Sequence, residues 1–284
     1  MNIVVCIKQV PDTKGGVKFN PDGTLDRAAM LAIMNPDDKA GLEAALRLKD
    51  QYGAEVTVVT MGLPKAEEVL REAMAMGADN GVLVTDRVLG GADTWATSQT
   101  IAGALRNLDY DLIITGRQAI DGDTAQVGPQ VAEKLALPQV TYAEEIQGCD
   151  GKIVTIKRRL ERGIEVATCP MPCVVTVNGS AAPCRPRNAR FVMKYKNAKG
   201  TQEAQDANED YFALVNERPY LKLTEWSVND IQSNPTDLGL SGSPTKVKNI
   251  ESVVFQAKEA KVLSGTDAEL DAMMKELITN HTIG

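Results

Sequence analysis

The sequence predicts an α/β fold: a doubly wound, mostly parallel Rossmann-like sheet with an added antiparallel hairpin and an extended C-terminal arm. Two observations support this class. Up to about residue 137, short β-branched runs alternate with amphipathic stretches of helical length, and the connecting loops are short. From about residue 140 apolar residues recur at every second position, and beyond residue 185 regular apolar periodicity fades.

Four apolar runs are expected to form the parallel strands. Right-handed crossovers place the carboxyl ends of such strands at one edge of the sheet, where ligands bind. The loops that follow the runs should therefore share a ligand site. A Pro-Asp-Gly turn within 17–26 predicts a hairpin excursion. The four runs cover residues 2–8, 55–62, 81–86 and 110–116.

Helices between these runs are marked by their end signals. Asn35 is expected at the N-cap of the first helix, with Pro36 at its first helical position and Gly53 just past its end. The remaining helices are expected over 64–77, from Asp93 or Thr94 to residue 108, and from Asp123 or Thr124 to Leu137.

The second half of the chain has a different organisation. Residues 152–178 alternate around Arg162-Gly163, which predicts an antiparallel hairpin at the sheet margin; its basic residues line a solvated face or a subunit interface. The following residues are polar and turn-rich, with a short amphipathic helix at 267–278. We therefore expect a nucleotide-binding domain over 1–184, and a partner-contact region with a C-terminal arm over 185–284.

Composition excludes several classes of function. A net charge of −7 and a pI near 5.0 argue against general nucleic-acid binding. No apolar run has the roughly 20 residues that span a bilayer. The N-terminus reads as a first strand and not as a signal peptide, and five scattered cysteines suit a reducing cytoplasm. The single histidine, His281, argues against histidine-based metal or triad chemistry.

The stretch ITGRQAIDGDTAQVGPQVAEKL, residues 113–134, carries the main candidate site. Its loop holds Gly116, Gly122 and Gly128 with two aspartates and no lysine, and it matches neither GxGxxG nor a P-loop. Phosphate binding there would rely on backbone N–H groups and a helix N-terminus, aided by Thr124 and Gln126. The aspartates would cap N–H groups or bond to a ribose. The alternative is an ordinary glycine-bearing turn that starts a capped helix.

Three more loops at the same expected edge favour a ligand site. They are the end of the first strand at Cys6, the segment MNPDD at 34–38, and Thr60-Met61-Gly62, where Gly62 opens access to the backbone. At 89–99, Thr94 and Thr97 share one face of a helix start, which predicts a further ligand contact or simply a capped helix.

The motifs VVCIKQVPDT, MNPDDKAGLEAALRLK, AMAMGADNGVLV, GRQAIDGDTAQVGPQVAEKL, IKRRLERGIEVATCPMPCVVTV and GLSGSPTK occur in this order. Together they resemble the β subunit of electron transfer flavoproteins from residue 1 to about 250. The resemblance implies an α subunit that carries an FAD and binds the arm of this chain. It also implies AMP in the β subunit of respiratory members, and a second FAD in bifurcating members.

At particular positions the chain resembles the bifurcating branch. Respiratory members have an acidic residue where this chain has Gly122, and Asn and Thr where it has Ala125 and Val127. These smaller side chains predict a roomier loop that accepts FAD. Contacts implied by the resemblance fall on Cys6, Asn35, Met61, Ala119, Gly122, Ala125, Gln126 and Val127; Thr60, Gly62, Thr94, Thr97, Gly116, Gln118, Asp123 and Thr124 join them as further binding candidates.

The resemblance further implies that NADH passes a hydride to this flavin. One electron continues to the α-subunit flavin and an acyl-CoA dehydrogenase, and the other reduces ferredoxin or flavodoxin. No side chain presents itself as a general acid or base, so we expect binding residues only. One alternative is a structural subunit that holds AMP. A nucleotide hydrolase or stress protein on the same topology would need an SGGxDS-type loop or a late glycine cluster, and the sequence has neither.

Weaker signals have structural explanations. The CPMPC run at 169–173 lacks CxxC spacing, so its thiols are expected to be buried. Residues 190–199 fall where the family contacts its dehydrogenases, and they predict a partner-contact zone. The stripe of Leu270, Met273, Met274 and Leu277 is typical of packing.

Overall fold

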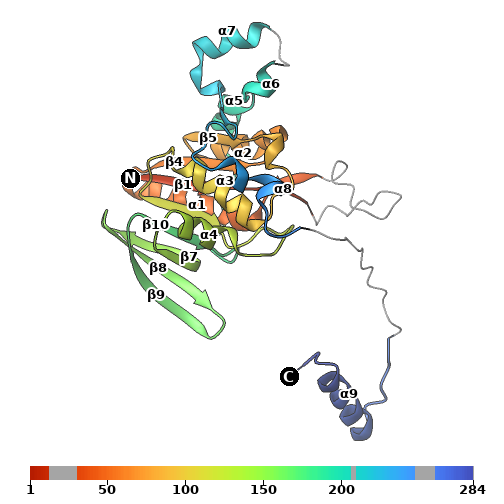
Figure 1. Ribbon diagram of the computed structural model, residues 1–284. Helices are drawn as coiled ribbons and strands as arrows, with labels where there is room; N and C mark the ends of the chain where they lie inside the picture. The colour runs from red at the N-terminus through yellow and green to blue at the C-terminus, as the bar shows by residue number, and fades with distance from the viewer. Residues whose placement is uncertain (13–30, 206–208, 247–259, 284) are drawn as a thin grey trace. The chain divides into compact units, whose positions relative to one another are not determined.

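The computed structural model describes residues 1–12, 31–205, 209–246 and 260–283 (Figure 1). The hairpin expected at 17–26 lies outside the described residues. By internal packing the chain divides into two units, Met1–Lys248 and Asn249–Gly284. The expected division of function at residue 184 stays a prediction.

The first unit is built on a nine-stranded sheet with the order β11-β5-β4-β1-β6-β10-β7-β8-β9. Neighbours from β11 to β7 are parallel, and β8 and β9 are added antiparallel, as expected. A separate antiparallel pair joins β2 (Gln9–Pro11) to β3 (Ala32–Met34). The sheet strands are β1 (Asn2–Cys6), β4 (Glu55–Met61), β5 (Asn80–Val84), β6 (Leu112–Gly116), β7 (Gln139–Cys149), β8 (Ile153–Leu160), β9 (Gly163–Pro170), β10 (Cys173–Val177) and β11 (Thr224–Trp226).

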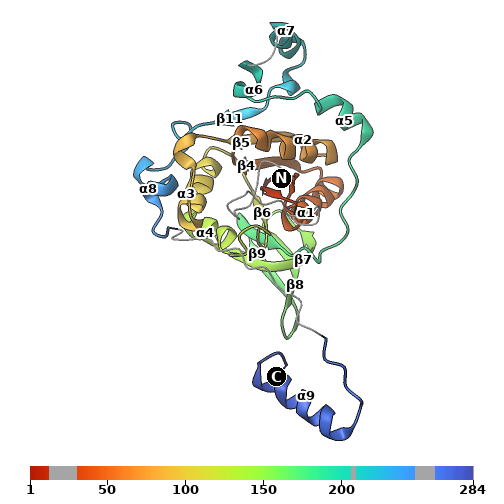
Figure 2. The same cartoon turned by 90° about the vertical axis from the view of Figure 1, so that its right-hand side faces the viewer.

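Two apolar layers hold helices against the faces of this sheet. One layer joins residues of β1 and β6, such as Ile3 and Ile114, to Leu42 of α1 and Leu70 of α2. The other layer packs α3 and α4 on the opposite face (Figure 2). Strand β6 is buried along its whole length, as a parallel strand covered on both faces must be. The helices are α1 (Pro36–Tyr52), α2 (Glu67–Met76), α3 (Thr94–Leu105) and α4 (Val127–Lys134).

The expected end signals of the first and third helices are confirmed, with one difference. Gly53 closes α1 in the left-handed conformation, with φ of 67°. Asp93 caps α3 by accepting a hydrogen bond from Ala96 N at 3.0 Å. Asn35 occupies the N-cap position of α1, but its side chain makes no capping bond and turns elsewhere.

Three details of the expected layout are wrong. The run at 173–177 is no part of the marginal hairpin, because it forms β10 between β6 and β7. Strand β7 was not expected at all. Helix α4 begins at Val127 and not at Asp123 or Thr124, because Asp123 and Ala125 are left-handed.

The polar stretch beyond residue 185 adds short elements to the first unit. Strand β11 pairs with β5 and extends the sheet. No helix in the described ranges has the length and apolarity needed to cross a membrane. The short elements are η1 (Pro64–Ala66), η2 (Arg87–Leu89), α5 (Ala189–Tyr195), α6 (Thr201–Gln205), α7 (Glu209–Glu217), η3 (Pro219–Leu221), η4 (Pro235–Asp237) and α8 (Gly239–Gly242).

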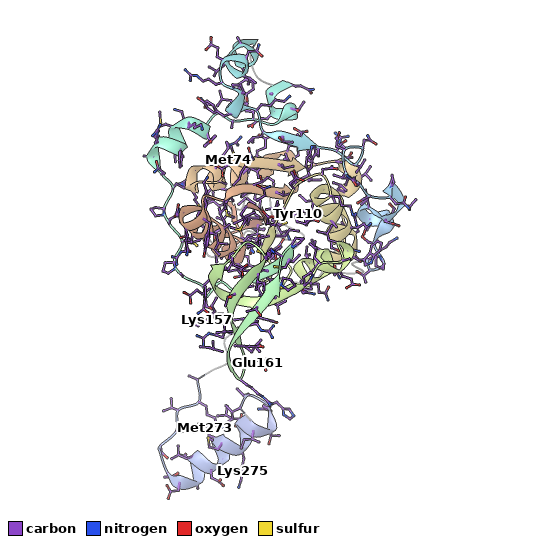
Figure 3. All side chains as sticks on the ribbon, turned by 90° about the vertical axis from the view of Figure 1, so that its left-hand side faces the viewer. Met74, Tyr110, Lys157, Glu161, Met273 and Lys275 are labelled. Atoms are coloured by element: carbon purple, nitrogen blue, oxygen red, sulfur yellow. The ribbon has the colours of Figure 1, made fainter. Side chains whose placement is uncertain are left out.

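Two surfaces leave apolar side chains exposed. Along the β8–β9 hairpin, on which Lys157 and Glu161 are labelled in Figure 3, Ile164 is 53% exposed and Val166 is 57% exposed. In the second unit, α9 (Asp267–Thr279) exposes Leu270 and Met274. Both surfaces are available to another chain.

Candidate functional site

A cavity of about 680 Å³ lies at the carboxyl ends of β1, β4 and β6, the edge expected to bind a ligand. The N-terminus of α3 and the loop from β6 to α4 complete its walls. Apolar side chains such as Val59, Leu89 and Ile101 line it together with polar and charged ones. Its size falls within the range of roughly 300–1,000 Å³ typical of small-molecule and cofactor sites.

Most of the expected binding residues line this cavity. They come from four separate segments of sequence, which the parallel topology brings to one edge. The lining residues among them are Cys6, Met61, Thr94, Thr97, Gly116, Gln118, Ala119, Gly122, Thr124, Ala125, Gln126 and Val127.

Asn35 is a positioning residue that does not line the cavity. Its side chain is fully buried and holds the loop from both sides. Nδ2 donates to Gln118 O at 2.8 Å, and Oδ1 accepts from Ile120 N at 3.1 Å. Two backbone groups of the loop that have no secondary-structure partner are thereby satisfied.

Thr60, Gly62 and Asp123 also lie outside the cavity lining. Thr60 is buried, and its Oγ1 has no hydrogen-bond partner within the described residues. Gly62 N donates to Val84 O at 3.1 Å. Asp123 is exposed and accepts from Gln118 Nε2 at 2.9 Å. Its carboxylate thus bonds to a side-chain amide of the loop, and the expected capping or ribose role of the aspartates stays a prediction.

The loop from β6 to α4 has a constrained backbone. Asp123 and Ala125 have φ of 49° and 52°, a region that non-glycine residues rarely occupy. Gln126 Oε1 accepts a hydrogen bond from Thr94 Oγ1 at 2.9 Å, so the loop is tied to the start of α3. Gly122 is not left-handed, so the unusual backbone of this loop is carried by Asp123 and Ala125.

Gly116 permits a close approach between β6 and the start of α1. A Cβ atom there would lie 2.3 Å from Asp38 Oδ1 and 2.6 Å from Asp38 N. Gly116 N donates to Asp38 Oδ1 at 3.0 Å. Gly128 similarly lets α4 approach the sheet, because its Cβ would lie 2.7 Å from Thr115 Oγ1.

Asp38 is a buried carboxyl that joins two strand ends. Its oxygens accept from Lys8 N at 2.8 Å and from Gly116 N at 3.0 Å. Burial raises the pKa of Asp38 to about 7, although hydrogen bonds from Asn35, Lys8 and Gly116 oppose the shift. Burial, and then the neighbouring Asp38, raises the pKa of Cys6 to about 12, so this thiol is a neutral lining group.

The loop has no lysine of its own, but a lysine from another segment lines the cavity. Lys8, two residues past the end of β1, lines the cavity, and its Nζ contacts Asp121 Oδ1 and Oδ2 at 2.7 and 2.8 Å. Arg117 also lines the cavity, with Nε 3.6 Å from Asp37 Oδ2. Burial raises the pKa of Asp37, and the nearby Arg117 opposes the shift. The signal available in the sequence was the position of each cation at a strand end: Lys8 is the last residue of the predicted run 2–8, and Arg117 directly follows the run 110–116.

The GLSGSPTK motif reaches the same site from far along the chain. Asp93 Oδ2 accepts from Thr245 N at 3.0 Å and from Thr245 Oγ1 at 2.7 Å. Thr245 thereby becomes part of the cavity lining. Burial alone would raise the pKa of Asp93, but hydrogen bonds from Ala96 N and from Thr245 outweigh it and lower the pKa.

The CPMPC thiols lie apart from the cavity. Cys169 on β9 and Cys173 on β10 are buried in an apolar layer. Burial, and then the adjacent Cys169, raises the pKa of Cys173. The Cys173 thiol is therefore protonated at neutral pH, and both cysteines pack as core residues.

Comparisons with known proteins agree with this architecture. The family described as electron transfer flavoprotein domain matches residues 22–209. The acryloyl-CoA reductase electron transfer subunit gamma of Anaerotignum propionicum is 45% identical over 100% of both chains. The electron transfer flavoprotein subunit beta of Clostridium acetobutylicum is 44% identical, over 97% of this chain and 94% of the relative. The caffeyl-CoA reductase-Etf complex subunit CarD of Acetobacterium woodii is 44% identical, over 87% of this chain and 86% of the relative. This chain belongs to the electron transfer flavoprotein family, as a β-type subunit.

Proposed function

We propose that the cavity of this subunit holds FAD in a heterodimer with a flavin-bearing α subunit. The bound FAD would supply acceptance of a hydride from NADH and one-electron transfer along two routes, to the α-subunit flavin and to ferredoxin or flavodoxin. An acyl-CoA dehydrogenase would receive electrons from the α-subunit flavin. The protein's part is to bind, orient and shield the cofactor.

The mixed lining of the cavity is the observation that carries this proposal. Val59, Leu89 and Ile101 provide apolar surface suited to an aromatic ring system, while Lys8 and Arg117 provide positive charge suited to a diphosphate. A nucleotide with a flavin needs both kinds of surface. Thr94 and Thr97 at the start of α3 add hydroxyl groups that can bond to ring nitrogens or carbonyls.

Free space at the loop favours the larger ligand. A Cβ atom added to Gly122 would have nothing within 4 Å, and Ala125 and Val127 are small lining residues. The resemblance to the bifurcating branch depends on these same positions. An acidic side chain at position 122 would instead add negative charge near the phosphates.

Relatives support the choice of partners. One relative is named as a subunit of acryloyl-CoA reductase and another as a subunit of a caffeyl-CoA reductase-Etf complex. A redox partner that acts on a CoA thioester is therefore proposed for this chain. Residues 190–199, which include most of α5, remain the proposed contact zone, and Met193 there is 65% exposed. The proposed place of action is the cytoplasm.

The test is to express the chain with its α subunit, purify the complex without added nucleotide, and identify what acid releases. Two FAD per heterodimer support the proposal, and anaerobic stopped-flow reduction by NADH should then bleach flavin in two distinguishable phases. One FAD with one AMP would reject a flavin in this chain and leave a structural AMP subunit. Release of no nucleotide beyond the α-subunit FAD would reject a nucleotide site here altogether.

A further inference from the structure

Each cation that lines the cavity is already held by a carboxylate of the chain. Arg117 Nε lies 3.6 Å from Asp37 Oδ2, and both atoms are buried without a hydrogen-bond partner within the described residues. Lys8 Nζ makes a much closer pair with Asp121, contacting both carboxylate oxygens at 2.7 and 2.8 Å. The Lys8–Asp121 pair crosses from the end of β1 to the loop between β6 and α4.

The two ends of this pair differ in freedom. The backbone of Lys8 is fixed, because Lys8 N donates to the buried Asp38 at 2.8 Å. Its ammonium group lies at the end of a flexible four-carbon stem, and the side chain is 48% exposed. Asp121 follows Ile120, whose N–H is held by Asn35, but no other described hydrogen bond fixes the Asp121 carboxylate. The ammonium can therefore change partner without moving the backbone.

We propose that Asp121 is an internal competitor for Lys8, and that a phosphate group of the ligand displaces it when the cavity is filled. This inference rests on the proposed binding of a phosphate-bearing nucleotide in the cavity. Asp121 would set how tightly the site retains its nucleotide, because every binding event exchanges one anion on Lys8 for another.

Replacing the Asp121 carboxylate on Lys8 by a phosphate gains about as much as it loses. An ammonium group donates up to three hydrogen bonds and serves a phosphate as well as a carboxylate. The released Asp121 side chain is partly exposed, so water can solvate it and the lost pair costs little. Among the other charged residues that line the cavity, Arg117 favours a bound phosphate, and Asp38 and Asp93 disfavour it. Asp37 beside Arg117 and Asp123 beside Gln118 add further negative charge around the lining. Removing Asp121 thus removes both a competitor and a negative charge.

The test uses calorimetric titration of the heterodimeric complex after this subunit's nucleotide has been removed. The ligands are adenosine, AMP and ADP, which share a base and ribose and differ in phosphates. Asp121→Asn should tighten AMP and ADP about three- to tenfold and leave adenosine unchanged, the scale of a partly exposed charge contact. Lys8→Met should weaken AMP and ADP, and adding Asp121→Asn to Lys8→Met should then give no gain beyond a general charge effect of less than twofold.

A matched control is Glu72→Gln, which removes the carboxylate from the Lys39–Glu72 pair, 2.8 Å long, similarly exposed and outside the cavity lining. It should leave all three affinities unchanged. Unchanged or weaker AMP and ADP binding in Asp121→Asn, with normal binding in the parent, would overturn the competitor role alone. A parallel change in adenosine affinity would also overturn it, because a loop-folding role would act on every ligand. Absence of binding by all three ligands in every protein would overturn the proposed function together with this inference.

Discussion

Gly116 lies where the last residue of β6 meets the first turn of α1, and it leaves no room for a side chain. We expect Gly116→Ala to lower the free energy of unfolding by roughly 1–3 kcal/mol, the usual cost of overpacking, because the added methyl would meet Asp38 backbone and carboxylate atoms. The same displacement would disturb the N–H bond from Gly116 to Asp38. Denaturant unfolding of the purified complex measures the change.

Gly122→Ala is the matched control for this prediction. It adds the same methyl group to the same loop, where nothing lies within 4 Å. Its stability should stay within about 0.5 kcal/mol of the parent. Equal losses in the two variants would show that glycine content, and not the approach to Asp38, limits this loop.

Asn35 supports the site without lining its cavity, because its side chain holds the loop between β6 and α4. Asn35→Ala removes the bonds to Gln118 O and Ile120 N and leaves both partly buried groups without this partner. Each such group costs about 1–3 kcal/mol, so we expect weaker nucleotide binding and faster hydrogen exchange across 117–126. Asn35→Asp keeps the acceptor and should restore the protection of Ile120 but not the bond to Gln118. Unchanged exchange in Asn35→Ala would contradict the positioning role.

Glu67 joins α2 to the segment that precedes α6, and it makes their association sensitive to pH. Its side chain is 1% exposed, and Oε1 accepts from Gly200 N at 2.9 Å. Burial, and then Glu203, raises the pKa of Glu67 to about 8 from 4.5, although Arg71 opposes the shift. The folded protein therefore binds more protons than the unfolded chain between these values, so this contribution to stability falls as pH rises from about 4.5 to 8.

Glu67→Gln retains an acceptor for Gly200 N but cannot ionise. We expect the melting temperature of the variant, relative to the parent, to rise between pH 5.5 and pH 8.5. Arg71 contacts both Glu67 and Glu203, and Glu203 acts on the same carboxyl, so the difference between the two proteins reports the loss of the titrating Glu67 from this Glu67–Glu203 pair. Melting curves that keep a constant separation across this range would contradict a raised pKa.

The sequence predicted helices and strands best where one pattern of apolar residues, helical or alternating, continued without interruption. Helix α1 carried its Pro36 and Gly53 signals, and both held. Strand β7 was missed because register shifts near Ala143 and Ile146, and a left-handed Tyr142, break its alternation. Strand β10 was assigned to the hairpin because only a short turn separates it from β9 in the sequence. In the structure β9 lies at the sheet margin, whereas β10 lies between β6 and β7.

At the scale of the whole molecule, the site depends on segments that are far apart in the sequence. Lys8 and Asp121 are separated by 113 positions, and Asp93 and Thr245 by 152. The edge of the sheet could be predicted because parallel topology fixes which loops meet there. Pairs of side chains across that edge could not be predicted, because they depend on strand order and loop shape. This is why the two lining cations were missed although the cavity was expected.

A flavin bound in the cavity at the carboxyl ends of β1, β4 and β6 is the central prediction for this subunit. The most direct measurement is the number of FAD molecules released per heterodimer by the parent, Gly116→Ala and Gly122→Ala complexes, each checked for intact assembly by size. We predict two FAD for the parent and for Gly122→Ala, and loss of one FAD in Gly116→Ala. Only one FAD in the parent would contradict the assignment of a flavin to this site, and retention of two FAD in an assembled Gly116→Ala complex would contradict the role given to Gly116 in shaping it.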